Sequence, residues 1–496
     1  MINVGEMRVS RILAAVAIAV LLAVLAGCSG LGARPGPAVF SLGEWPTYMN
    51  GIQHTGYTEN TTITRQNAGQ VEMLWKINPD EGYEQFDSVF SQPVISGDRI
   101  YFGSWDGNEY AVDHNGQVLW KAFLGRTVDP TNCVPLQGGV SGTAALADSM
   151  NSSQKGKWLY VTGGDGSLYA LNADTGETIW STHLGDPPAS YLWSSPVLYN
   201  GSVFTAMASF GDCPLVRAFV VKLDAKSGKI QNTFYTVPEN CVGGSVWSVP
   251  SIDPETGVLY VTTGNAEKCG DQAPYQNAIL ALNTKDLSYV DHWQVPQAEW
   301  VVDSDFGATP TLFETSAGRK LVGAGNKNGM YYALDRSDLK AGPVWKVRLA
   351  EGGPCPQCGQ GVLAPTAFDG KRLYSAGGQT TIQGKTCGSS LRAHNPDDGT
   401  VLWETCLPVE NDPFPAAITG AVTVTPDLVL AGYARSVVIL GKDNGEVLNT
   451  LTVQADENLK HPPPYFWGPP SIAAGMIFAG NMSGEFIAFG VKGQNQ

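Results

Sequence analysis

Hydrophobic residues in this chain recur in short runs that alternate with polar positions and are separated by glycine-containing turns. The clearest unit begins at Tyr160 and passes through the turn Asp165-Gly166 into a second strand. A further turn at Gly176 leads into a last strand that ends at Trp180. Alternation of this kind is typical of half-buried strands, and Asp-Gly or Thr-Gly pairs supply the positive φ of tight hairpin turns. The unit therefore predicts a small antiparallel sheet.

This unit returns along nearly the whole chain at intervals of roughly 45–60 residues, a spacing suited to about four strands per repeat. Its other copies end at or near Trp120, Phe234, Trp293, Trp345, Trp403 and Leu448. The last copy stops near Phe489 without a closing strand, whereas residues 71–75 resemble a closing strand without a preceding copy. Joining these two segments completes an eighth unit and favours a closed ring over an open solenoid.

The repeat therefore predicts an all-β fold, an eight-bladed β-propeller that spans residues 44–490. Each blade is expected to contain four antiparallel strands, and the N-terminal strand is expected to close the ring. The tryptophan at the end of each closing strand is expected to pack between neighbouring blades. Residues 491–496 are left as a short tail.

Composition agrees with this fold and limits the partners. The 496 residues include 58 glycines and 31 prolines, which suits many short strands joined by tight turns. The formal net charge is −15, and no run of lysine and arginine interrupts it. An acidic surface repels phosphate backbones, so the sequence excludes nucleic acid as a partner. The same charge is compatible with a calcium site or a basic protein partner.

The N-terminus has the pattern of an export signal. Arg8 and Arg11 precede an apolar run over residues 12–26 that ends in Gly27-Cys28. This pattern resembles a bacterial lipobox, so residues 1–28 are predicted to be a lipoprotein signal peptide with Cys28 as the lipidated residue. The alternative is a transmembrane anchor, for which the run is short. Residues 29–43, rich in Gly, Pro and Ala, are predicted to be a flexible tether, and the protein is expected on the periplasmic or extracellular face of the bacterial membrane.

Export implies an oxidising compartment, in which cysteines pair. Eight cysteines remain after Cys28, namely Cys133, Cys213, Cys241, Cys269, Cys355, Cys358, Cys387 and Cys406. Their even number fits four disulfides, whose pairing the sequence leaves open. The CxxC spacing of Cys355 and Cys358 favours a loop staple over a redox thiol, since no thioredoxin-like pattern surrounds it. Gly359 follows where a c-type haem site requires histidine.

The repeat resembles that of the pyrroloquinoline quinone (PQQ) propeller superfamily. Trp45-Pro46 and the segment from His54 to Gly56 look like the entry motif of that family. The middle blades resemble most the polyvinyl-alcohol-dehydrogenase-like group of quinoprotein alcohol dehydrogenases. The repeats are also similar to the propeller lipoprotein of the outer-membrane protein assembly machinery.

The resemblance to the enzymes implies a set of site residues. Trp247 matches the tryptophan that forms the floor beneath the quinone, and Asn265 matches an amide ligand of calcium. Asp303 matches the catalytic base, which is often a calcium ligand as well, and Asp305 is the alternate base. Lys327 matches the cation that reaches the quinone carbonyl oxygens.

Two further residues complete the expected set. Trp467, near the C-terminal end of the chain, is expected to be an aromatic contact to the cofactor. Asp212 is the carboxylate available as a metal ligand in a stretch where the enzymes usually supply a glutamate. Val302 stands where many relatives have tryptophan, and no two cysteines are adjacent, so the vicinal disulfide of methanol-type enzymes is missing.

The resemblance leaves three functions open. The first is an exported PQQ- and calcium-dependent dehydrogenase that oxidises the hydroxyl of a sugar or of a small or polymeric alcohol. Its electrons would pass to a separate acceptor, because the chain carries no CxxCH haem segment. The second is a non-catalytic lipoprotein scaffold in cell-envelope protein assembly. The third is a passive binder of polysaccharide or peptide.

Overall fold

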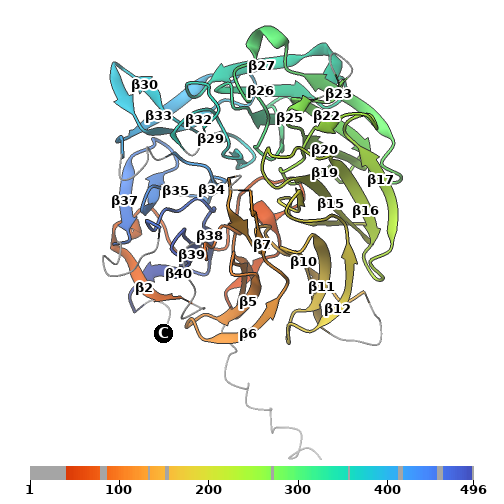
Figure 1. The fold of residues 1–496 in the computed structure, drawn as a ribbon. Helices are drawn as coiled ribbons and strands as arrows, with labels where there is room; N and C mark the ends of the chain where they lie inside the picture. The colour runs from red at the N-terminus through yellow and green to blue at the C-terminus, as the bar shows by residue number, and fades with distance from the viewer. Residues whose placement is uncertain are drawn as a thin grey trace, which may run out of the picture. The chain divides into compact units, whose positions relative to one another are not determined.

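The computed structural model forms eight antiparallel sheets that follow one another around a central axis (Figure 1). It describes residues 41–78, 87–131, 134–150, 156–267, 269, 273–355, 358–410, 417–454 and 462–493. The signal peptide, Cys28 and nearly all of the predicted tether lie outside these residues. No helix in the described part of the chain is long and apolar enough to span a membrane. The prediction of an eight-bladed propeller is confirmed.

Each blade has four strands, which follow one another from the inner strand outward. The first four blades are β3 (Val94–Gly97), β4 (Arg99–Gly103), β5 (Asn108–Asp113) and β6 (Val118–Phe123); β9 (Ala145–Asp148), β10 (Lys157–Thr162), β11 (Ser167–Asn172) and β12 (Thr178–His183); β14 (Val197–Tyr199), β15 (Ser202–Ser209), β16 (Phe219–Asp224) and β17 (Ile230–Tyr235); and β19 (Ser251–Asp253), β20 (Val258–Thr262), β22 (Ala278–Asn283) and β23 (Tyr289–Gln294).

The next four blades are β24 (Thr311–Glu314), β25 (Lys320–Gly325), β26 (Met330–Asp335) and β27 (Pro343–Arg348); β28 (Ala367–Phe368), β29 (Leu373–Gly377), β32 (Ser389–His394) and β33 (Val401–Leu407); β34 (Thr423–Val424), β35 (Leu428–Tyr433), β36 (Ser436–Gly441) and β37 (Val447–Thr452); and β38 (Ser471–Ala473), β39 (Met476–Gly480), β40 (Phe486–Val491) and β2 (Val71–Ile77). β1 (Gly43–Trp45) pairs with β3, and β13 (Ser190–Tyr191) pairs with β15, so each adds a short strand to its blade. Short strands outside the blades are β7 (Thr127–Val128), β8 (Gln137–Gly138), β18 (Val242–Gly243), β21 (Ala266–Glu267), β30 (Thr380–Ile382) and β31 (Lys385–Cys387).

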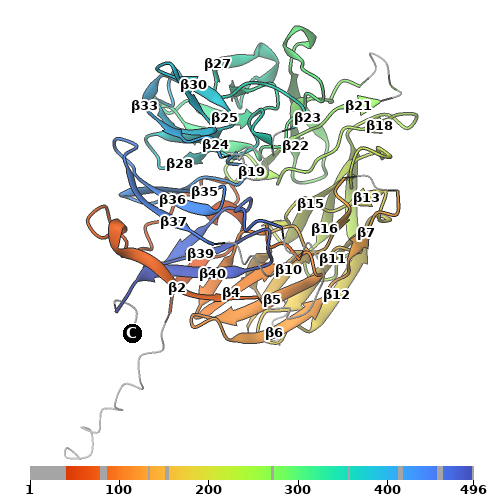
Figure 2. The same cartoon turned by 60° about the vertical axis from the view of Figure 1, so that its left-hand side comes forward.

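The ring is closed by the first and last strands of the chain, as predicted. β2 pairs antiparallel with β40, from Val71 opposite Val491 to Ile77 opposite Phe486 (Figure 2). This pairing gives the last blade its fourth strand. The outer edge of β40 is therefore covered, and the ring is closed between the two ends of the chain.

The repeated tryptophans join neighbouring blades, which confirms their predicted role. Nε1 of Trp120 donates a hydrogen bond of 3.1 Å to the carbonyl of Ala173 in the next blade. The indole lies against Gly176, where a Cβ would approach it to 2.6 Å. Trp75, Trp180, Trp345 and Trp403 make the same pair of contacts, each with a carbonyl and a glycine of the following blade. The glycine of a Thr-Gly, Ser-Gly, Asp-Gly or Asn-Gly turn in one unit thus contacts the tryptophan of the preceding unit.

An extended segment over residues 42–60 crosses the inner strands of the blades. Its carbonyls accept one hydrogen bond each from the inner edges of six blades, in chain order Pro46 from Leu146, Ile52 from Ile252, Gln53 from Leu312, Thr55 from Phe368, Gly56 from Val424 and Asn60 from Ala474. The segment contains His54, which is fully buried beside Ser251 with 2.7 Å between Nδ1 and Oγ. Burial lowers the pKa of His54 to about 3, so the imidazole stays neutral. The residues that resemble an entry motif therefore form a strap across the ring.

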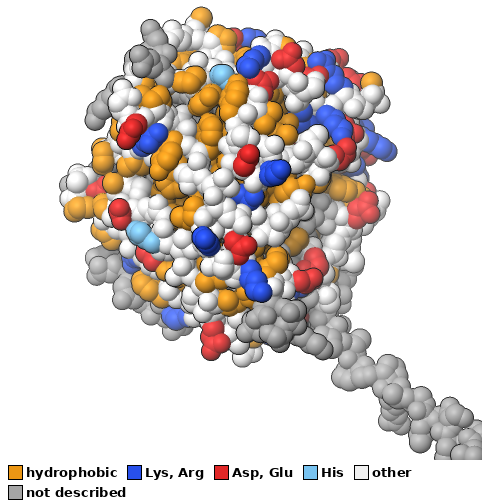
Figure 3. All heavy atoms as spheres, turned by 90° about the vertical axis from the view of Figure 1, so that its right-hand side faces the viewer, with side chains coloured by type: hydrophobic (Ala, Val, Ile, Leu, Met, Phe, Trp, Pro, Cys, Tyr) orange, Lys and Arg blue, Asp and Glu red, His pale blue; other side chains and the backbone are white. Residues whose placement is uncertain are grey.

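The outer strands expose apolar side chains to the outside of the ring. Ile230, Tyr235 and Val290 on β17 and β23 are each 44–45% exposed. On this side of the molecule the hydrophobic side chains stand among lysines, arginines and acidic residues (Figure 3).

Candidate active site

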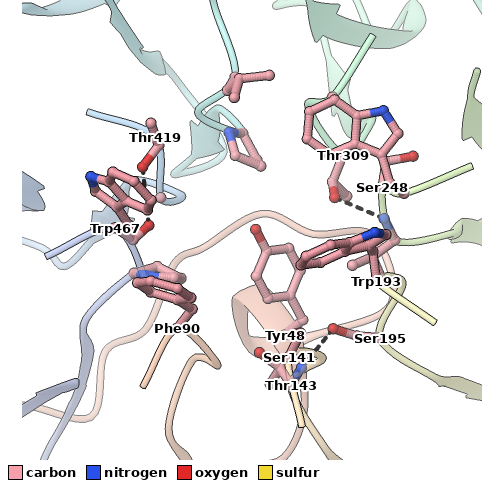
Figure 4. A pocket seen from close by; sticks show the side chains of 17 residues that line it. Tyr48, Phe90, Ser141, Thr143, Trp193, Ser195, Ser248, Thr309, Thr419 and Trp467 are labelled. Atoms are coloured by element: carbon pink, nitrogen blue, oxygen red, sulfur yellow. Dashed lines mark hydrogen bonds between the residues drawn. The ribbon is translucent and has the colours of Figure 1, made fainter. Parts of the chain in front are cut away.

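Eight residues, one from each blade, form a ring around the axis. Each stands four positions before the first residue of its inner strand, and together they are Phe90, Ser141, Trp193, Trp247, Gly307, Leu363, Thr419 and Trp467. We call this set the floor ring. It encloses a central chamber of about 220 Å³, into which Tyr48 of the strap points (Figure 4).

Trp247 reaches into the chamber because its neighbour in the floor ring is a glycine. A Cβ at Gly307 would overlap the six-membered ring of Trp247 and the Leu363 side chain. Trp193 also faces the chamber and stacks on Phe210, with ring centroids 5.9 Å apart and an interplanar angle of 9°. The middle blades therefore supply a broad aromatic wall.

A second cavity, of about 270 Å³, shares Trp193 and Trp247 with the central chamber. We call it the site cavity. Its lining consists of Val134, Pro135, Trp193, Ala208, Ser209, Phe210, Gly211, Asp212, Ser245, Trp247, Asn265, Asp305 and Lys327. Five of the residues expected from the sequence, spread over nearly 120 positions of the chain, thus line one cavity.

A buried lysine between two carboxylates is the main electrostatic feature of the cavity. Nζ of Lys327 lies 2.8 Å from Oδ2 of Asp303 and 3.0 Å from Oδ1 of Asp305. It also lies 5.4 Å from the ring centroid of Trp247, within the range of a cation–π contact. Burial by itself lowers the pKa of Lys327, but the two carboxylates outweigh it and the pKa is raised, so the ammonium stays charged.

The two aspartates have different environments. The side chain of Asp305 is 8% exposed and lines the cavity, and burial raises its pKa to about 7 although Lys327 opposes the shift. Asp303 is 22% exposed, has a φ of 56°, and contacts the lysine without lining the cavity. The structure thus separates the two acids that the sequence offered as base and alternate.

Asn265 is held at the cavity wall by a two-stranded sheet. β18 pairs with β21, which begins one residue after Asn265, and the amide of Gly244 donates a 2.7 Å hydrogen bond to the Asn265 carbonyl. The Cys241–Cys269 disulfide links the two ends of this small sheet. Figure 2 shows β7, β13, β18 and β21 along one side of the ring.

Asp212 is exposed at the same cavity. Partial burial, and then the charge of Asp303, raise its pKa. Oxygen atoms of Asp212, Asn265 and Asp305 therefore face one space. No cluster of three or more His, Cys, Asp or Glu side chains suited to a metal occurs among the described residues.

Trp467 is placed apart from this polar group. It belongs to the floor ring and stacks on Phe90, with ring centroids 5.5 Å apart, and it lines the central chamber rather than the site cavity.

Sequence reasoning did not find the aromatic partners Trp193 and Phe210. A signal for Trp193 exists, because Trp193-Ser-Ser-Pro196 and Trp247-Ser-Val-Pro250 occupy the same position of the repeat. Phe210 has no such signal.

The disulfides agree with the prediction that the cysteines pair with one another. Cys241 pairs with Cys269, Cys355 with Cys358, and Cys387 with Cys406. Cys213 is also disulfide-bonded, whereas Cys133 lies outside the described residues. The CxxC pair forms a loop staple.

The fold and the cavity define an eight-bladed propeller of the quinoprotein class, and comparison of the sequence with known families agrees. Residues 45–357 match the family described as the β-propeller domain of glucose, ethanol and alcohol dehydrogenases, and the chain belongs to this family. Residues 293–496 also match the family of the outer membrane protein assembly factor BamB.

Known relatives are similar at low identity. A polyvinylalcohol dehydrogenase of a Pseudomonas species is 25% identical over 78% of this chain, which spans 64% of that relative. Quinohemoprotein alcohol dehydrogenase ADH IIB of Pseudomonas putida is 27% identical over 90% of this chain and 68% of its own length. The chain is thus shorter than these relatives.

Solved structures share the fold. The quinohemoprotein alcohol dehydrogenase of Comamonas testosteroni superposes with a TM-score of 0.69 at 18% identity, covering 91% of this chain and 81% of that one. BamB of Moraxella catarrhalis gives a TM-score of 0.53 at 14% identity, covering 85% of this chain and 99% of that one.

Proposed function

We propose that this chain is a dehydrogenase that oxidises the hydroxyl group of an alcohol, with PQQ bound in the site cavity against Trp247. The observation that carries the proposal is the buried group of Lys327, Asp303 and Asp305 beside an aromatic wall. Charged groups that are buried together in a cavity and have shifted pKa values are typical of catalytic sites. Membership of the alcohol dehydrogenase propeller family supports the same chemistry.

The residues present fit a planar, anionic cofactor. When bound, the quinone would accept a hydride from the carbon that carries the hydroxyl group. The indole of Trp247 offers it an aromatic face, and Trp193 and Phe210 extend the apolar wall. The ammonium of Lys327, 5.4 Å from the centre of the Trp247 ring, would stabilise negative charge on the cofactor oxygens.

Asp305 is the residue that we assign as general base. Its pKa of about 7 leaves a substantial share of the carboxylate deprotonated at neutral pH, and a base with a pKa near the working pH is the most effective. It would accept the hydroxyl proton at a carboxylate oxygen. Asp303 would fix the position of Lys327 through the 2.8 Å ion pair and serve as the reserve base.

Asn265, Asp212 and Asp303 are the residues that we propose as calcium ligands. Calcium takes carboxylate and amide oxygens, and this donor set supplies both types. The fit is partial, because Asp212 is exposed and stands where the enzymes have a glutamate, and because Asp303 pairs with Lys327 without lining the site cavity. We therefore expect weaker calcium binding than in a site with a third well-buried carboxylate.

The rim of the cavity favours an alcohol with apolar substituents over a sugar. Val134, which lines the cavity, is 75% exposed, and Val302, next to Asp303 in the chain, is 77% exposed. Exposed apolar side chains at a cavity mouth gain free energy when an apolar ligand covers them.

Export and anchoring are part of the proposal. Cys28 would be lipidated and become the first residue of the mature protein, residues 29–43 would tether the propeller, and electrons would leave to a separate acceptor. Metabolic labelling with a fatty acid should mark the full chain and fail to mark Cys28→Ser.

The test is dye reduction by the protein loaded with PQQ and calcium, over a panel of aliphatic alcohols and sugars. We expect activity with alcohols that requires both additions, and we expect Asn265→Ala to need a higher calcium concentration. Bound quinone without reduction of dye by any alcohol would overturn the proposal.

A scaffold function is the second candidate, supported by the match of residues 293–496 to the BamB family. It predicts capture of an envelope assembly partner by the tethered protein. Under this alternative Asp303→Asn and Asp305→Asn would leave partner capture unchanged.

A further inference from the structure

The loop residues 351–355 and 358–361 lie directly on the backbone of Lys327. The amide of Gly353 donates a 3.0 Å hydrogen bond to the carbonyl of Lys327. On the other side, the amide of Lys327 donates a 3.0 Å hydrogen bond to the carbonyl of Asp305. The peptide unit that carries the lysine is therefore clamped between its partner Asp305 and this loop.

Glycines allow the loop to approach so closely. A Cβ at Gly361 would lie 2.7 Å from the carbonyl oxygen and 2.8 Å from Cα of Lys327, and Gly361 has a φ of +73°. A Cβ at Gly352 would meet the carbonyl of Asn328 at 2.6 Å. Any other residue at these positions would push the loop away from the lysine, because such distances are shorter than real carbon contacts.

The Cys355–Cys358 disulfide holds this loop together. The amides of Cys358 and Gln360 donate to the carbonyl of Cys355 at 3.0 and 3.1 Å. In return, the amide of Cys355 donates to Oε1 of Gln360, whose side chain lies against Gly353. A continuous set of contacts thus runs from the disulfide through Gln360 and Gly353 to Lys327.

We infer that the Cys355–Cys358 disulfide positions the site: it shapes the loop that clamps Lys327 and so keeps the ammonium between Asp303 and Asp305. The inference that this matters for catalysis rests on the proposed function. Both cysteines act through the lysine and touch no reacting atom. Without the bridge the loop loses its fixed shape, and the ammonium moves away from Asp305.

The readout is the position of the Lys327 ammonium in crystal structures of the protein without quinone. In the Cys355→Ala/Cys358→Ala variant we expect Nζ of Lys327 to leave Oδ1 of Asp305, so that their separation rises from 3.0 Å to more than about 4 Å, the limit of an ion pair. The matched control is Cys387→Ala/Cys406→Ala, which removes the bridge between β31 and β33.

Gly361→Ala tests the clamp with the disulfide intact and should lengthen the same distance. Gly370→Ala is its control, because Gly370 also has a positive φ, of +85°, but nothing lies within 4 Å of its Cβ position. An unchanged distance between Lys327 and Asp305 in both test variants, or an equal change in the controls, would overturn the inference. Because no quinone is present, failure of the proposed function would appear separately, as absent quinone binding with the displacement of Lys327 intact.

Discussion

The outer and inner parts of the propeller use the repeat in opposite ways. At the outer edge, Trp120, Trp180, Trp345 and Trp403 make the same contacts with a carbonyl and a glycine of the next blade. In the floor ring the equivalent position changes from blade to blade, from Trp247 to Gly307 to Leu363. Repetition therefore serves stability, whereas the departures from it create the site cavity.

The largest expected effect is at the site. Asp305→Asn should lower kcat by about 10²–10⁴-fold, the usual contribution of a general base. In the unaltered protein kcat/KM should rise with pH through about 7, because Asp305 becomes a base as it loses its proton. That rise should vanish in the variant. Asp186→Asn, at an aspartate whose side chain is 97% exposed, should change neither quantity.

At the outer edge, Trp120→Ala should lower the free energy of unfolding by about 3–5 kcal/mol, because it leaves a cavity and an unpaired carbonyl between blades. Quinone affinity should not change. Leu119→Ala, at a side chain that is 43% exposed, should alter stability by less than about 0.5 kcal/mol. Chemical denaturation together with quinone titration measures both quantities, and a large loss of affinity in Trp120→Ala would remove the distinction between the two regions.

Gly307→Ala should affect both regions moderately. The new Cβ overlaps Trp247 and Leu363, and overpacking of this kind costs about 1–3 kcal/mol. Displacement of the indole should weaken quinone binding by about tenfold or more. Calorimetry is the measurement, with Gly69→Ala as control because its nearest atom would be 3.8 Å away. If Gly307→Ala bound quinone as tightly as the unaltered protein does, the position of the Trp247 indole beside Gly307 would not matter for quinone binding.

The smallest expected effect concerns Glu109, a departure from the repeat that lies outside the site cavity. It is fully buried at a position where other blades have Leu168 or Phe486, and its carboxylate accepts no hydrogen bond within the described residues. Burial raises its pKa well above the usual value. Since the unfolded chain ionises more readily, this group destabilises the protein increasingly as pH rises above the unfolded pKa of about 4.3.

Glu109→Leu should therefore raise the melting temperature more at pH 8 than at pH 4, by a few degrees for about 1 kcal/mol. Thermal denaturation at both pH values checks this. Equal changes at the two pH values would show that Glu109 ionises normally in the folded protein.

The ring could be predicted from the sequence, because the same kinds of side chain recur in each repeat and mark its turns and closing strand. The Asp165-Gly166 turn and Trp180 predict one blade, and residues 71–75 predict its closure. The strap over residues 42–60 was not predicted, because it contacts the blades through the pairing of β1 with β3 and through single backbone hydrogen bonds, which leave no repeated side-chain pattern.

The site could be predicted as a set of residues but not as a geometry. Asp303 and Asp305 differ in placement, because only Asp305 lines the site cavity, and the positive φ of Asp303 has no signal in the sequence. The resemblance predicts Trp467 as an aromatic contact to the cofactor, yet Trp467 lines the central chamber rather than the site cavity. The space that Gly307 leaves for Trp247 depends on a contact between blades, which no local pattern records.

The most direct test of the account is a titration of the propeller with PQQ and calcium, followed by calorimetry and absorbance. Trp247→Ala is compared with Trp403→Ala, which removes a tryptophan of the outer edge. The account predicts calcium-dependent binding that is lost in Trp247→Ala and retained in Trp403→Ala. Absence of binding at saturating cofactor, or equal affinity in both variants, would contradict the assignment of the site cavity to a quinone.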